Sequence, residues 1–283
     1  MRAVSPLPSD PESADLRLAL RLADLADEIT MARFGALDLA VDTKSDMTPV
    51  SEADTLVERT LRAHLETARP ADGILGEEYG QGGDRPANDS TTTPPATGRL
   101  WIIDPIDGTQ GYVRRTPVWA TLVALEAHGE PVVGVVSAPA LGRRWWAARG
   151  EGAHVREGGP GAPARRISVS AANELADAQF CFGGLEDWWR AGREPQLREL
   201  AERVARTRGY GDFWQYMLVA EGAAEIACDP LVSVWDLAAP LVIVTEAGGR
   251  FTDLTGAPSH AGADGGLATN GLLHDAALAI LGR

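Results

Sequence analysis

The sequence predicts an α/β protein built in several layers, and two observations lead to this fold class. Two segments near the N-terminus carry apolar residues at helical spacing and precede a series of short apolar, strand-like segments. The second half of the chain alternates strand-like with helix-like segments. Such alternation is typical of architectures in which helices cover the faces of sheets. The 283 residues suffice for one large domain or for two smaller ones that share a cleft.

The first half of the chain is expected to be a sheet flanked by two helices. Residues 1–12 are rich in Pro and Ser, which indicates a flexible N-terminal tail. Helices are expected at 13–34 and at 51–66, the second opened by Ser51 with an acid three residues later. Residues 80–98 are low in complexity and indicate a flexible surface loop. The expected strands are 73–78, 100–104, 120–127, 130–139 (paired with the preceding one through a turn at 128–129), 145–155 and 165–170.

The second half is expected to contain mixed strands and helices. Strands are predicted at 178–184, 225–229, 249–254 and 265–270. Helices are predicted at 195–207, 213–224, 235–249 (stopped by a double glycine) and 272–281, with a turn at 208–213. We therefore expect a single domain, 13–283, made of an N-terminal α+β half (13–170) and a C-terminal α/β half (171–283).

Composition limits the kinds of binding partner and the cellular compartment that are expected. The net charge of −14 argues against a nucleic-acid partner and against an anionic membrane surface, because both require basic patches. No apolar run approaches 18 residues, and the N-terminus lacks the apolar core of a signal peptide. The two cysteines, Cys181 and Cys228, lie in apolar surroundings, which fits a reducing compartment. These features predict a cytoplasmic protein with no membrane contact.

Acids end several of the apolar segments: Glu77 with Glu78, then Asp104 and Asp107 in the stretch WIIDPIDGT, and Asp236. Two neighbouring carboxylates repel each other unless a cation lies between them. Magnesium prefers carboxylate oxygens and leaves room for phosphate. A turn stiffened by Pro105 would bring the carboxylates of Asp104 and Asp107 and the Ile106 carbonyl to one side. We therefore expect a site for two cations about 3.5–4 Å apart, the spacing of phosphoryl-transfer clamps.

Gly108 and Thr109 follow these acids and are expected to open a helix. Backbone N–H groups at a helix start favour an anion, and a glycine lets a phosphate approach the chain closely. The hydroxyl of Thr109 is able to orient an attacking water. Gly108 and Thr109 are therefore predicted to bind phosphate.

Three segments, GEE at 76–78, WIIDPIDGT at 101–109 and VWDLAAPLVIVTEAGG at 234–249, resemble the signature segments of the inositol-monophosphatase family. The similarity extends from the first helix to ATNGLL near the C-terminus. It implies a five-layer α-β-α-β-α sandwich of the inositol-monophosphatase and sugar-phosphatase type, magnesium-dependent hydrolysis of a small phosphate monoester, and a homodimer.

The resemblance also implies a set of functional residues. Glu77, Asp104 and the Ile106 carbonyl would hold one magnesium, and Asp104, Asp107 and Asp236 a second. Parts of the family have a third, weaker ion near Glu77, which gives two to three ions per active site. Glu77 and Thr109 would position the nucleophilic water. Asp54 resembles an acid that supports the catalytic centre, although with Ser51 it also makes a capping box. Lys44 is either a member of the water network or a solvated loop residue.

Further stretches resemble the branch of the family that hydrolyses L-histidinol phosphate in histidine biosynthesis: 42–54, 117–125, 136–153, 208–213 and 230–239. The ammonium and imidazole of this ester call for acids and a flat apolar wall. Asp212 and Asp229 are the candidate acids. Asp212 could instead be a turn residue, and Asp229 could instead accept hydrogen bonds from inositol hydroxyls. Trp119 is a candidate wall, with core packing as the alternative. The sequence departs from the branch at Gln110-Gly111, where a lysine and an asparagine are more usual.

Three alternatives remain open. The substrate could be inositol 1-phosphate, or a range of sugar phosphates. The same fold could serve as a non-catalytic magnesium-binding regulator, although the complete acid set speaks against it. A glycosidase is disfavoured because its paired carboxylates usually lie on separate strands. The five histidines do not cluster, so neither a zinc site nor a Ser-His-Asp triad is expected.

Overall fold

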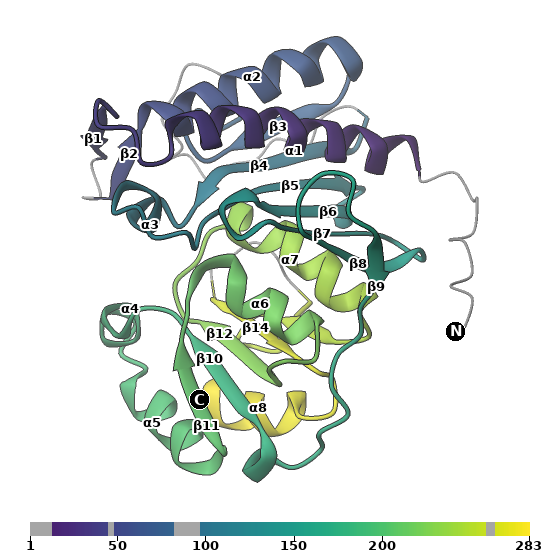
Figure 1. Ribbon diagram of the computed structural model, residues 1–283. Helices are drawn as coiled ribbons and strands as arrows, with labels where there is room; N and C mark the ends of the chain where they lie inside the picture. Colours follow the sequence, from purple (N-terminus) through teal and green to yellow (C-terminus); the bar gives the residue numbers. More distant parts are fainter. Residues whose placement is uncertain (1–12, 45–47, 82–96, 259–263) are drawn as a thin grey trace, which may run out of the picture.

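The computed structural model describes residues 13–44, 48–81, 97–258 and 264–283. These residues form five stacked layers in the order α-β-α-β-α, as expected (Figure 1). The expected tail at 1–12 and most of the expected loop at 80–98 lie outside the described residues.

The outer helical layer consists of α1 (Ala14–Arg33) and α2 (Glu52–Ala68), close to the ranges expected. Their apolar faces, which include Leu22 and Leu61, pack on one face of the first sheet. Burying this stripe, rather than helix propensity, supplies most of the stability of such helices. A short hairpin of β1 (Val41–Thr43) and β2 (Pro49–Ser51), which the sequence did not indicate, precedes α2 and carries Lys44 at its bend.

The first sheet has seven strands in the order β3-β4-β5-β6-β7-β8-β9. Side chains of a strand alternate between its two faces. In β4, Trp101 and Ile103 accordingly pack against the outer helices. Leu100 and Ile102 point to the opposite face of the sheet and pack against the helices of the middle layer, which is described below. The strands are β3 (Gly73–Gly76), β4 (Arg99–Asp107), β5 (Ala120–Ala127), β6 (Glu130–Ala138), β7 (Arg143–Ala148), β8 (Gly152–Glu157) and β9 (Ala164–Arg166).

The middle layer consists of α6 (Asp212–Ala220) and α7 (Val234–Glu246), between the two sheets. The helix α7 lies directly against β6, because a Cβ at Gly134 would come within 2.5 Å of the Ala239 carbonyl oxygen. It ends at the expected double glycine, where Gly248 has φ 91°. This layer joins the two halves of the chain into one packed unit.

The second sheet has five strands in the order β11-β10-β12-β14-β13. Its outer face is covered by three helices, two of which were expected (Figure 1). The short helix α4 and the edge strand β11 were not expected. The strands are β10 (Gln179–Phe182), β11 (Arg206–Gly209), β12 (Ile226–Asp229), β13 (Arg250–Thr252) and β14 (Gly266–Thr269), and the helices are α4 (Leu185–Arg190), α5 (Glu194–Arg203) and α8 (His274–Leu281).

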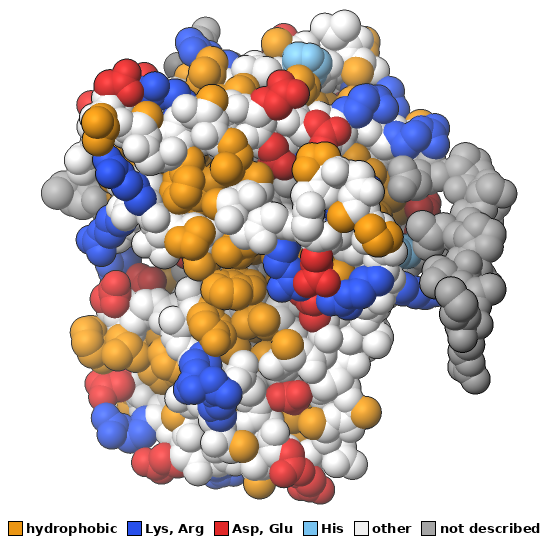
Figure 2. All heavy atoms as spheres, viewed as in Figure 1, with side chains coloured by type: hydrophobic (Ala, Val, Ile, Leu, Met, Phe, Trp, Pro, Cys, Tyr) orange, Lys and Arg blue, Asp and Glu red, His pale blue; other side chains and the backbone are white. Residues whose placement is uncertain are grey.

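The surface carries both signs of charge. Figure 2 shows acidic and basic side chains interspersed over one face, with hydrophobic side chains gathered across its middle, from α1 down to α6. Cys181 and Cys228 are free thiols and buried. Among the described residues, no helix is both long and apolar enough to cross a membrane.

Candidate active site

Strand β4 brings Asp104 and Asp107 together through a β-bulge. The expected turn at Pro105 is wrong, because the strand continues to Asp107. Asp104 pairs with Leu122 of β5, and Asp107 pairs with Ala120 of β5. Between these two pairs, two residues of β4 therefore stand opposite a single residue of β5. In a regular strand, residues three apart point to opposite faces, and the extra residue of a bulge corrects this. Proline suits the bulge because it has no N–H to offer the neighbouring strand.

Asp236 joins these two acids from the first turn of α7. One carboxylate oxygen from each of Asp104, Asp107 and Asp236 lies within 4.8 Å of the other two. Backbone amides orient two of them: Ser233 N donates to Asp236 Oδ2 at 2.7 Å, and Phe213 N donates to Asp107 Oδ2. Asp104 Oδ1 is buried and has no hydrogen-bond partner within the described parts of the chain. We call these three residues the acid triad.

The acid triad has the electrostatics of a cation site. Burial raises the pKa of Asp104 well above its usual range, and the charges of Glu77, Asp107 and Asp236 raise it further. Burial and the charges of Asp212 and Asp236 do the same to the pKa of Asp107. The pKa of Asp236 rises to about 7, mainly through burial. A cluster of oxygen ligands with an unsatisfied buried oxygen and excess negative charge fits magnesium.

Gly108 and Thr109 begin the short helix α3 (Thr109–Val113), as expected. Gly108 has φ 84°, and a Cβ there would lie 3.1 Å from the Val118 carbonyl oxygen. The hydroxyl of Thr109 lies 2.9 Å from the carbonyl oxygen of Ile106, the predicted backbone ligand of a metal. The same hydroxyl lies 3.3 Å from Asp54 Oδ1.

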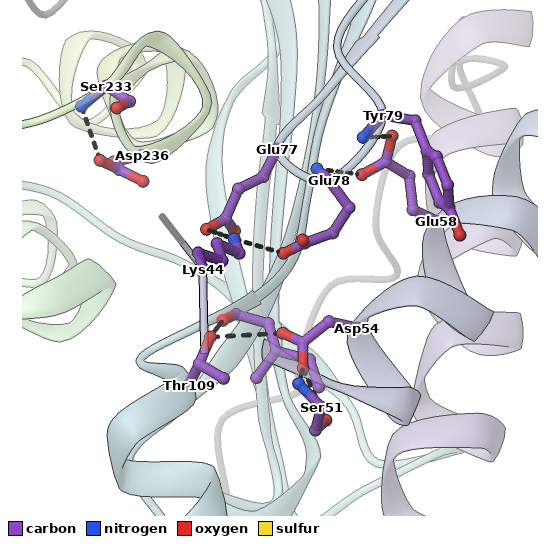
Figure 3. A network of polar contacts seen from close by, with 11 residues as sticks. Lys44, Ser51, Asp54, Glu58, Glu77, Glu78, Tyr79, Thr109, Ser233 and Asp236 are labelled. Atoms are coloured by element: carbon purple, nitrogen blue, oxygen red, sulfur yellow. Dashed lines mark hydrogen bonds and ion pairs between the residues drawn. The ribbon is translucent and has the colours of Figure 1, made fainter. Parts of the chain in front are cut away.

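Asp54 combines the two roles that the sequence left open. Its Oδ2 accepts from Ser51 N at 2.8 Å and from Ser51 Oγ at 2.6 Å, which makes the capping box of α2. Its Oδ1 faces Thr109 (Figure 3). The side chain is fully buried, and burial raises its pKa to about 6. The helix cap therefore positions an acid beside the predicted catalytic threonine.

Glu77 lies beside the acid triad but pairs with Lys44. Lys44 Nζ is 2.7 Å from Glu77 Oε1 and 2.7 Å from Glu78 Oε1 (Figure 3). Burial and the charge of Glu77 raise the pKa of Glu78 to about 7, even with the lysine nearby. Lys44 is thus a member of the site and not a solvated loop residue.

A pocket of about 300 Å³ extends from the acid triad toward the second sheet. Asp212 and Asp229 line it, as expected of substrate-binding residues, together with Asp107 and Asp236. Asp187 of α4 also lines it and was not identified from the sequence. Its only sequence signal is an acid in the first turn of a short helix, which is common for other reasons.

The pocket acids are held by specific contacts. Asp229 Oδ1 accepts from Gly183 N at 2.9 Å, and its Oδ2 accepts from Gln215 Nε2 and from Tyr216 OH. Burial raises the pKa of Asp229 to about 7, and the charge of Asp212 adds to this. Asp212 has φ 50°, an uncommon conformation for a residue with a side chain. Burial and then the charge of Asp187 raise the pKa of Asp212 to about 6.

Trp119 lies in the core and not in the pocket. Its side chain is fully buried against Phe34 and Tyr112, with the Tyr112 ring centroid 4.9 Å away. This position argues against the predicted stacking on substrate and favours the alternative of core packing. At the departure Gln110-Gly111, the glycine has a packing reason, because a Cβ at Gly111 would lie 2.8 Å from the Val118 carbonyl oxygen.

Comparison with known proteins identifies one family. The model of the inositol monophosphatase family matches residues 13–282. The histidinol-phosphatase of Mycobacterium tuberculosis is 55% identical over 269 residues, which cover 94% of this chain and 97% of the relative. That of Streptomyces coelicolor is 52% identical over 94% of this chain and 96% of the relative. The solved IMPase of Thermotoga maritima superposes with a TM-score of 0.79 at 28% identity, over 94% of this chain and 96% of that one.

Proposed function

Because the chain belongs to the inositol monophosphatase family, we propose that it is a magnesium-dependent phosphomonoesterase that hydrolyses L-histidinol phosphate to L-histidinol and phosphate. The observation that carries the chemistry is the acid triad, whose carboxylate oxygens converge with no ion-pair partner among the residues that the structure describes. The identity of 52–55% to proteins named histidinol-phosphatase supports the substrate. The reaction would serve histidine biosynthesis.

Two to three magnesium ions per site are proposed. Glu77, Asp104 and the Ile106 carbonyl would hold one ion, and the acid triad a second, with a weaker site near Glu77. Bound there, magnesium would neutralise charge on the phosphoryl group and make water a better nucleophile.

The residues around the metal site supply orientation and proton transfer. Thr109 presents a hydroxyl that Asp54 and the Ile106 carbonyl can both accept from, so its oxygen lone pairs are left for an attacking water. Asp54, with a pKa of about 6, is mainly ionised at neutral pH and able to accept a proton through Thr109. Gly108 leaves room for a phosphate oxygen because it has no side chain.

The acids that line the pocket support the proposal that the alcohol part of the substrate is cationic. Its three acids beyond the acid triad, Asp187, Asp212 and Asp229, face a space of about 300 Å³ that is large enough for a small ester. Histidinol carries an ammonium group and an imidazole, and both can donate to carboxylates. A neutral polyol offers hydroxyl donors but no charge, and so gains less from three acids.

A panel of esters tests the proposal. We expect kcat/KM for L-histidinol phosphate to exceed that for inositol 1-phosphate by at least about 100-fold, which is the effect expected from two additional charge-assisted hydrogen bonds to the substrate. A preference for inositol 1-phosphate or for sugar phosphates would replace the substrate with one of the alternatives. Absence of magnesium-dependent phosphate release from every ester would favour a non-catalytic regulator.

We also propose that residues 13–283 form one domain and that the protein is a cytoplasmic homodimer. Packing of α6 and α7 against the first sheet supports the single domain. Buried free thiols fit a reducing compartment, and the hydrophobic side chains across the face in Figure 2 suit a subunit interface. Light scattering at micromolar concentration measures the assembly state, and a monomer would contradict the proposal.

A further inference from the structure

Glu77 neighbours the acid triad, where its charge acts on Asp104, and is at the same time paired with Lys44. It is the one side-chain ligand of the proposed metal set that is not among the three carboxylates grouped within 4.8 Å. Its Oε1 is 2.7 Å from Lys44 Nζ. The side chains of both residues are about four-fifths buried, with exposures of 21% and 20%. An ion pair at this depth is weakly screened by solvent, so it competes with any other cation for Glu77.

Lys44 also forms an ion pair with a second acid, Glu78, whose position is fixed by its surroundings. Glu78 Oε1 is also 2.7 Å from Lys44 Nζ, and only 7% of its side chain is exposed. Glu58 fixes the backbone here, because its carboxylate accepts from Glu78 N at 2.7 Å and from Tyr79 N at 3.2 Å. Glu58 is itself neutralised by Arg62 at 2.8 Å. Glu78 therefore keeps Lys44 in place whichever partner Glu77 has.

We propose that Lys44 is an exchangeable counter-cation of the metal site. Without metal, its ammonium neutralises Glu77; when magnesium binds, Glu77 passes to the metal and Lys44 stays on Glu78. This inference rests on the proposed function, since it assumes that Glu77 is a magnesium ligand.

Two consequences follow from the charges. Two carboxylates with one ammonium have a net charge of −1, whereas two carboxylates alone would have −2 and would repel each other when buried. Lys44 therefore stabilises the metal-free protein. It also lowers the affinity for magnesium, because the metal must displace one cation and then lie near it. Glu78 opposes this second effect by holding the displaced ammonium.

Calorimetric titration with MgCl2, together with thermal unfolding in EDTA and in excess MgCl2, tests the exchange without an activity assay. The magnesium site under test is the one that includes Glu77, and it is identified in the titration as the binding event that the variant Glu77→Gln lacks. We expect Lys44→Gln to lower the unfolding temperature in EDTA and to tighten magnesium binding by about ten-fold. Glu78→Gln should instead weaken magnesium binding, because Lys44 then has Glu77 as its one remaining partner.

Two controls separate exchange from general effects. Lys44→Arg keeps the charge and should bind magnesium within about two-fold of wild type. Arg33→Gln removes a cation that pairs with Asp38 and Glu52 instead, and should leave magnesium binding unchanged. If Lys44→Gln binds magnesium no more tightly, or unfolds earlier by equal amounts in EDTA and magnesium, Lys44 is merely structural and the inference is wrong. If Lys44→Gln does not fold, Glu78→Gln decides. Failure of the wild type to bind magnesium overturns the proposed function itself.

Discussion

The hydroxyl of Thr109 lies 3.3 Å from Asp54 Oδ1, across 55 positions of sequence, and 2.9 Å from the Ile106 carbonyl oxygen. One proton is thus shared between an acceptor on α2 and an acceptor in the bulge of β4. The other oxygen of Asp54 is occupied by Ser51 in the cap of α2. The direction of the Thr109 hydroxyl is therefore set by a helix cap, and cap and chemistry can be separated by mutation.

Asp54→Asn is expected to lower kcat by about 100-fold, because the amide cannot accept a proton through Thr109. Ser51→Ala is the matched control: it removes a capping hydroxyl, should cost about 1 kcal/mol of stability, and leaves the carboxylate of Asp54 in place. The measurements are kcat with L-histidinol phosphate and urea unfolding of each variant. Equal losses of kcat in both variants would mean that Asp54 acts only as a cap.

Asp107→Asn is expected to reduce turnover by at least about 1000-fold at saturating magnesium, because the metal site loses a charged ligand. The fold should persist, since the amide oxygen of asparagine can still accept from Phe213 N. Turnover and circular dichroism on the same preparation check both statements. Activity within a few-fold of wild type would contradict the assignment of Asp107 as a metal ligand.

The stability of the metal-free protein should fall as pH rises from 6.5 to about 8.5. An acid with a higher pKa in the folded state binds more protons when folded, so its deprotonation destabilises the fold. Asp236, with a folded pKa of about 7, contributes about 1 kcal/mol over this range, and Asp104 and Asp107 shift in the same direction. The range starts at pH 6.5 because His274, whose pKa burial lowers to about 4, gives the opposite slope below that value.

Thermal unfolding in EDTA and in excess MgCl2 measures this dependence. Magnesium should remove most of the fall, because it binds the deprotonated acids. Asp236→Asn should reduce the slope in EDTA. A metal-free protein whose stability is constant or rises over this range would show that the acids are not protonated in the fold.

Asp187→Asn is expected to raise KM for L-histidinol phosphate by about ten-fold, because it removes one carboxylate from the pocket. KM for glycerol 2-phosphate, whose alcohol is neutral, should change little. Glu186→Gln is the control, since Glu186 is the neighbouring acid on α4 and does not line the pocket. Equal increases for both esters would assign Asp187 to general electrostatics and not to recognition of a cation.

The sequence predicted the layers better than the local geometry. Apolar spacing was sufficient for α1 and α2, and the family resemblance supplied the five layers and the three segments that carry the acid triad. The bulge in β4 was missed because Pro105 between two acids reads as a turn, and only pairing with β5 distinguishes the two. The ion pairs of Lys44 depend on the hairpin β1–β2, whose strands are too short for an alternating pattern.

Burial explains the remaining differences in the site. Trp119 could not be assigned to pocket or core from its neighbours in sequence, because both environments favour an aromatic ring. Asp187 was missed because it meets Asp212 only in the pocket, where α4 and the start of α6 come together from segments that are distant in sequence.

The proposed active site is divided between the two halves of the chain. Asp54, Asp104, Asp107 and Thr109 belong to the first sheet and its helices, and Asp236 of α7 completes the acid triad, whereas the pocket residues Asp187, Asp212 and Asp229 come from segments around the second sheet. Hydrolytic machinery and alcohol selectivity can therefore evolve separately. A lineage could exchange one leaving group for another by substitutions confined to 183–232 while its phosphoryl chemistry stays intact, so directed evolution toward a new ester should randomise that interval first.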